Sequence, residues 1–208
     1  MKRFIGYFFG TVFRPNRAFA ALQSDPKRLS KGLRAILVPG ILFMITAGLL
    51  AVGGALVAAP PILPLAGENY YVFQVFFALP VFLGGWLLAA SFARVFGHWR
   101  KAKASYGGTL AALGFALGIP ALAAWVPQAV FAALTLLGMG QDEFMDLTAG
   151  PGPQRTIAFG LQGLVALWTV VLSAAAVRSG LKLPWPKAIP VGLLTAAVFI
   201  AFLLVFIR

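Results

Sequence analysis

The 208 residues of the chain are 61% hydrophobic and 11% charged, against roughly 25% charged in soluble domains. This composition indicates a polytopic membrane protein without room for a soluble domain of ordinary size. Cysteine is absent, which excludes disulfides, thiolate metal sites and cysteine nucleophiles. The net charge of +12 indicates contact with anionic lipid headgroups and not with nucleic acid, because the basic residues flank apolar spans and form no nucleic-acid motif.

Residues 1–34 are expected to lie on the cytoplasmic membrane surface as amphipathic helices. Their first apolar run holds ten residues, too few to span a bilayer, so a short interfacial helix is the better interpretation. A signal peptide is disfavoured because Arg14 and Arg17 separate this run from the small-residue site at 18–20. The side chains predicted to contact lipid or a partner are Phe4, Phe8, Phe9, Arg14, Arg17 and Phe19.

Two further short helices are predicted before the first span. Pro15 ends the first helix, and residues 16–22 form the second. Ser24, Asp25 and Pro26 then resemble a capping residue followed by a first-turn proline, which predicts a third helix that carries several Lys and Arg residues towards the membrane.

Residues 35–208 are predicted to form an all-α bundle of five transmembrane helices. The expected spans are residues 35–57, 72–96, 107–125, 156–177 and 189–207. Small residues recur at intervals of four in the second and third spans, a spacing that lets helices approach closely within the chain or between two copies of it. The residues predicted to make these helix contacts are Gly85, Ala89, Gly114 and Gly118.

The longest uncharged stretch, residues 107–138, contains two prolines. Because proline removes a backbone donor and pushes against the preceding turn, we expect Pro120 and Pro127 to break the third span. A shorter helix over 128–137 would then continue at the far interface or fold back.

Charge alternation along the chain predicts the topology. With the N-terminus in the cytoplasm, five spans place 15 of the 17 Lys and Arg residues on the cytoplasmic side and four of the five acids on the other. Positive residues stay on that side because their translocation is unfavourable. We therefore expect the C-terminus to lie on the side of the membrane opposite the cytoplasm.

No pattern in the sequence indicates an enzyme. There is no catalytic, metal-binding or cofactor-binding motif, and no ionisable residue at mid-membrane. Hydrogen bonding between helices is the expected role of Gln128 and Gln162, and a polar lining for a permeation path is the alternative. The polar residues within the spans are Gln74, Ser91, Gln128, Gln162, Thr169 and Ser173.

The N-terminal segment resembles that of bacterial members of the Yip family, membrane proteins related to Rab-GTPase-interacting factors. The residues that carry the resemblance are Pro15, Ala18, Phe19, Leu22, Pro26, Tyr106, Gly107, Gly108 and Pro120. The resemblance implies a non-enzymatic, five-span membrane protein, and its eukaryotic relatives act in vesicle trafficking and often self-associate. The Ala- and Gly-rich composition suggests a bacterial source, where Rab partners are absent. We therefore expect an inner-membrane protein of bacteria whose C-terminus faces the periplasm or the cell exterior.

Two functions follow as hypotheses. The first is a membrane scaffold or adaptor whose basic N-terminal helices contact anionic lipids, a membrane-protein partner or a second copy of the chain. The second is a transporter, channel or lipid-handling protein that uses the interrupted third span, since broken helices often line sites.

Overall fold

The computed structural model describes residues 2–57, 62, 67–99, 105–140, 142–143, 146 and 152–207. Five of its helices are long and apolar enough to cross a membrane. These are α3 (Arg28–Val52), α4 (Tyr70–Trp99), α5 (Tyr106–Leu136), α7 (Pro153–Leu181) and α8 (Trp185–Phe206). Two short helices, α1 (Lys2–Phe13) and α2 (Pro15–Gln23), precede them, and the 3₁₀ turn Gly67–Asn69 leads into α4. The predicted all-α, five-helix architecture is confirmed.

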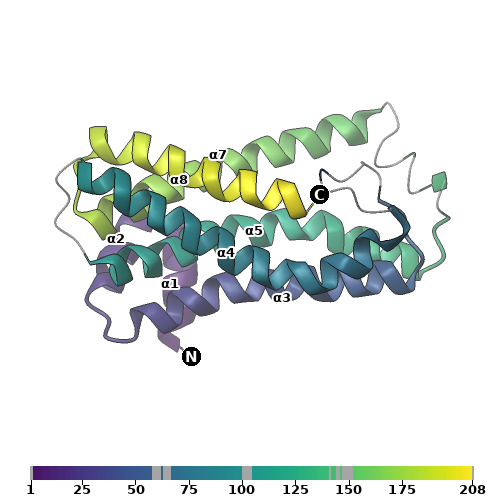
Figure 1. Cartoon of the computed structure of the whole chain (residues 1–208), viewed down its shortest axis with the longest axis horizontal. Helices are drawn as coiled ribbons and strands as arrows, with labels where there is room; N and C mark the ends of the chain where they lie inside the picture. The colour runs from purple at the N-terminus through teal and green to yellow at the C-terminus, as the bar shows by residue number, and fades with distance from the viewer. Residues whose placement is uncertain are drawn as a thin grey trace.

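The long helices run along a common axis, whereas α1 crosses this axis at the end of the bundle where α2 lies (Figure 1). Helix α5 is the central element: it packs against α3, α4 and α7, and every residue from Gly108 to Ala121 is buried. Helix α8 covers α4 and α7 from the other side. The core therefore surrounds the first half of α5.

Glycines allow α3 and α5 to touch through their backbones. A Cβ placed on Gly114 would lie 2.2 Å from the backbone oxygen of Gly32, and one on Gly118 would lie 2.2 Å from that of Ala35. Such short distances leave no room for a side chain, so the two helices meet at their main chains. Gly114 and Gly118 thus lie at a contact within the chain.

Helix α5 runs without interruption through Pro120 and Pro127, so the predicted break of the third span is wrong. Each proline removes one hydrogen bond, to the carbonyl of Ala116 or Ala123, while the other bonds of the helix remain. Within a bilayer an interrupted helix would expose many more unpaired backbone groups to hydrocarbon, which favours continuing the helix. The segment 128–137 is therefore mainly the last part of α5.

Several helices are longer than the predicted spans because their ends extend beyond the most apolar residues. Helix α3 begins at Arg28 and includes Lys31 and Arg34, which the sequence placed before the membrane. Ser24 and Asp25 do not cap it, since the residue at its N-cap is Lys27. Asp25 instead accepts a hydrogen bond from the Lys27 amide at 2.8 Å, within the turn that joins α2 to α3.

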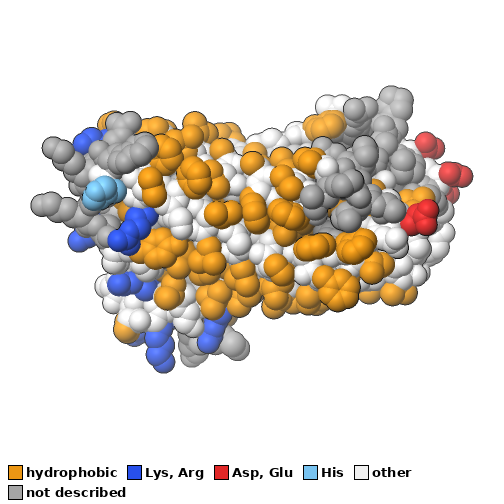
Figure 2. Space-filling model, viewed as in Figure 1, with side chains coloured by type: hydrophobic (Ala, Val, Ile, Leu, Met, Phe, Trp, Pro, Cys, Tyr) orange, Lys and Arg blue, Asp and Glu red, His pale blue; other side chains and the backbone are white. Residues whose placement is uncertain are grey.

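Charge is divided between the two ends of the molecule. Lys and Arg side chains gather at the end formed by α1 and α2, acidic side chains gather at the opposite end, and hydrophobic side chains cover the surface between them (Figure 2). This distribution is what a bilayer-spanning bundle with two aqueous faces requires.

Candidate membrane-surface site on the N-terminal helices

Two faces of helix α1 have different surroundings. One face packs on the bundle: the rings of Phe4 and Phe115 lie 5.5 Å apart, and Phe8 contacts the same core. A second face exposes Ile5, Phe9 and Phe13, of which Phe13 is 76% exposed. The spacing of four residues places these three on one stripe of the helix. Phe9 therefore lies where it can contact lipid, while Phe4 and Phe8 are half-buried.

Helix α2 is anchored to the bundle. Phe19 and Leu22 are fully buried in the core, and the Gln23 side chain donates a hydrogen bond of 3.0 Å to the Gly108 carbonyl of α5. The prediction that Phe19 contacts lipid or a partner is therefore wrong. An apolar residue on a short amphipathic helix is suited equally to a membrane and to a protein core, and here the core is available.

Asp25 joins α1 to the start of α3. Its carboxylate accepts a hydrogen bond from the Tyr7 hydroxyl at 3.0 Å and forms an ion pair with Lys31. The Lys31 ammonium also lies 4.9 Å from the centre of the Tyr7 ring, a cation–π contact. The hydrogen bond from Lys31, followed by that from the Lys27 amide, lowers the pKa of Asp25 to about 2. Burial, and then the hydrogen bond to Asp25, raises the pKa of Tyr7.

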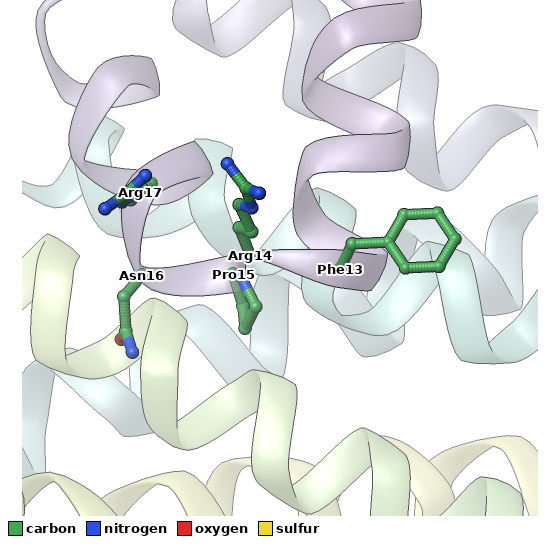
Figure 3. Close-up of a pocket in the computed structure, with 5 residues that line it drawn as sticks. All are labelled: Phe13, Arg14, Pro15, Asn16 and Arg17. Carbon is green, nitrogen blue, oxygen red and sulfur yellow. The ribbon is translucent and has the colours of Figure 1, made fainter.

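Two adjoining shallow hollows lie beside α1 and α2. One has a volume of about 510 Å³ and is lined by residues 13–17. The other, of about 450 Å³, lies between the two helices. Arg14 and Arg17 line both, and Arg3 lines the second. In Figure 3, Arg14 and Arg17 extend to the same side, while Asn16 points towards a neighbouring helix and Phe13 points away.

Asn16 connects this region to the rest of the basic end. Its side-chain oxygen accepts a 3.4 Å hydrogen bond from Arg178 of α7, whose guanidinium lies 4.8 Å from the centre of the Trp185 ring. Asn16 therefore points towards α7 and away from Arg14 and Arg17 (Figure 3).

The other predicted site residues lie in the bundle. Gly85 of α4 faces α8, since a Cβ on it would lie 3.1 Å from the Phe199 ring, and Ala89 is fully buried. Gln162 is exposed on α7. Gln74 is buried, and neither of its amide atoms has a hydrogen-bond partner among the described residues. These polar residues do not come together in either hollow.

Sequence reasoning did not single out Arg3, Tyr7 and Gly10 as parts of one surface. The relevant pattern is present, since residues 3, 6, 7 and 10 recur at helical spacing on one side of α1, and Arg14 follows directly after this helix. Asp25 is also the first of the chain's five acids and the only one before residue 68. An isolated acid among many cations is a candidate for an ion pair.

Comparison with known families identifies the family of the chain. The family model described as the Yip1 domain matches residues 9–207, nearly the whole chain. The chain belongs to the Yip1 domain family. The match to this Yip1 domain includes Arg14, Arg17 and all five long helices, and it begins after Arg3 and Phe4. No curated protein and no solved structure matches the chain.

Proposed function

We propose that this Yip1-domain protein is a non-enzymatic scaffold or adaptor of the bacterial inner membrane. It contacts anionic lipids and a membrane-protein partner, or a second copy of itself, through the basic surface of α1 and α2. Its N-terminus lies in the cytoplasm and its C-terminus on the opposite side.

The observation that supports this role best is the packing of α1 and α2 against the bundle. Phe19 and Leu22 pack α2 into the core, and the hydrogen bond from Tyr7 to Asp25 holds α1, so both helices are fixed to the bundle. The outer surface of α1 and α2 exposes Phe9, Phe13 and the arginines that line the hollows. A surface that is fixed to the bundle and exposes both apolar and cationic side chains is suited to binding a lipid or a protein partner.

The transporter hypothesis has less support. It was motivated by an interrupted third span, and α5 is continuous. Gln74 and Gln128 are polar side chains within the spans, each with at least one buried amide atom that has no partner among the described residues. The two hollows, however, are not lined by either residue. We therefore favour the adaptor.

Crosslinking in native membranes tests the adaptor role. The variant replaces Phe13, Arg14 and Arg17 with alanine, all of which are exposed, so that the bundle stays intact. Proteins recovered with the unmodified chain should be lost from this variant. A control with Leu137→Ala, which is 84% exposed near the opposite end, should retain them. An unchanged set of recovered proteins in the first variant would reject the adaptor, and solute flux in reconstituted vesicles would favour the transporter.

A further inference from the structure

We propose that the groove between α1 and α2 binds the phosphate of an anionic membrane phospholipid through Arg3, Arg14 and Arg17. This inference rests on the proposed docking role of the same surface and names its lipid ligand.

The groove has a small-residue floor and cationic walls. Gly6 and Gly10 of α1 lie opposite Ala18 and Ala21 of α2, and a Cβ on Gly10 would come within 3.1 Å of the Ala18 Cβ. A Cβ on Gly6 would meet no atom within 4 Å, so the groove is open at that point. Tyr7 also lines the groove, and the small residues beside it let a headgroup approach between the helices.

The three arginines come from two helices and line one hollow. Arg3 lies near the start of α1, Arg14 occupies the N-cap of α2, and Arg17 follows one turn later. The planar guanidinium group binds phosphate through two parallel hydrogen bonds, which makes arginine better suited to this ligand than lysine. Groups of this kind arranged around an open hollow of about 450 Å³ match a phospholipid headgroup.

No acid competes for these arginines in the part of the chain that the structure describes. Asp25 is the nearest carboxylate in sequence, and Lys31 pairs with it. That ion pair is the sole one among the described residues. The positive charge of the groove is therefore available to an external anion.

The depth of α1 favours a lipid over a soluble phosphate. The 31 residues of α5 span about 46 Å, so about 8 Å projects from each side of a 30 Å hydrocarbon core on which the helix is centred. Phe115, which contacts Phe4, lies about 14 Å from the start of α5 and thus about 5 Å inside the core. This is the depth of an interfacial helix.

The exposed stripe of α1 supplies the apolar half of the site. Ile5, Phe9 and Phe13 are 49%, 56% and 76% exposed, at a depth where acyl chains begin. Phe13 points away from Arg14 and Arg17, so cationic and apolar contacts occupy separate faces (Figure 3). A molecule that presents a phosphate beside hydrocarbon chains satisfies both faces, whereas a soluble phosphate satisfies only one.

Native mass spectrometry of the full-length chain in detergent, titrated with phosphatidylglycerol or phosphatidylcholine, tests the proposal. The test variant carries Arg3→Gln, Arg14→Gln and Arg17→Gln. The control removes three other exposed charges of the same end, with Lys27→Gln, Arg34→Gln and Lys187→Gln. The unmodified chain should prefer phosphatidylglycerol. The test variant should lose at least about tenfold of that preference, as expected when one or more charge-assisted contacts disappear.

Three results would overturn the proposal. They are retention of the preference by the test variant, an equal loss in the control, and displacement of phosphatidylglycerol by glycerol phosphate at similar concentration. Should the triple variant fail to fold, Arg17→Gln alone is measured by the same criteria, since that side chain is exposed. Protein partners are absent from this assay, so its result is independent of the crosslinking test of the adaptor role.

Discussion

At the scale of single residues, the structure depends on a few positions where chemistry or space allows no substitute. Gly114 and Gly118 are such positions because a backbone oxygen of α3 lies where their Cβ would be. Asp25 is another, because it contacts Tyr7, the Lys27 amide and Lys31 together. The first two hold the bundle together, and the third holds α1 against it.

Gly114→Ala should destabilise the folded protein by about 1–3 kcal/mol, because the added methyl group forces two backbones apart. Gly107→Ala, on the same helix, is the matched control, since a Cβ there meets no atom within 4 Å. Thermal unfolding of both variants in detergent measures the difference. Equal midpoints for the two variants would show that the α3–α5 contact is looser than the structure indicates.

Asp25→Asn should loosen α1. The folded-state pKa of Asp25, about 2, lies below its ordinary value of 3.8. The ionised carboxylate therefore contributes stability that is complete above about pH 4 and is lost as the pH falls through about 2. At pH 7, hydrogen exchange over residues 2–13 should be faster in the variant than in the unmodified chain, and the difference should shrink below pH 4. Glu68→Gln, at the opposite end, should leave this exchange unchanged.

At the scale of elements, the sequence predicted which segments are helices better than it predicted their partners. Hydropathy and length were enough for five spans and the first two short helices, and the spacing of Gly114 and Gly118 indicated a close contact. The third predicted short helix is wrong, because its residues from Arg28 on are the beginning of α3. The lipid or partner contact predicted for Phe19 is wrong because an apolar residue on a short amphipathic helix can face either a bilayer or a protein core. The helix break predicted at Pro120 and Pro127 is wrong because exposing unpaired backbone groups to lipid is unfavourable, which keeps α5 continuous.

The α1–α2 arrangement can be tested with engineered disulfides, which need no background removal because the chain lacks cysteine. Gly10→Cys combined with Ala18→Cys should crosslink under mild oxidation, since the Cβ atoms would lie about 3.1 Å apart, and a shift of a few tenths of an ångström brings them to the disulfide range of about 3.5–4.5 Å. Gly6→Cys with Ala18→Cys should not, because no atom lies within 4 Å of a Cβ on Gly6. The reverse pattern, read from gel mobility, would place α1 in a different register on α2.

At the scale of the whole molecule, most basic side chains lie at one end of the bundle and most acidic side chains at the other (Figure 2). The basic end carries α1, α2 and the arginine groove, and the acidic end lies at the far side of the apolar surface (Figure 2). Translocation of so many cations is unfavourable, so the basic end is expected to remain in the cytoplasm, beside the anionic leaflet. The lipid site and the adaptor role both depend on this orientation.

Labelling of single cysteines with a membrane-impermeant maleimide tests that orientation most directly. The positions are Lys27→Cys and Lys187→Cys at the basic end and Glu143→Cys at the acidic end, all exposed. In inside-out membrane vesicles the first two should react and the third should not, and in right-side-out spheroplasts the pattern should reverse. Reaction of Lys27→Cys and Lys187→Cys in intact spheroplasts would contradict the cytoplasmic placement of the arginine groove, and with it the proposed function.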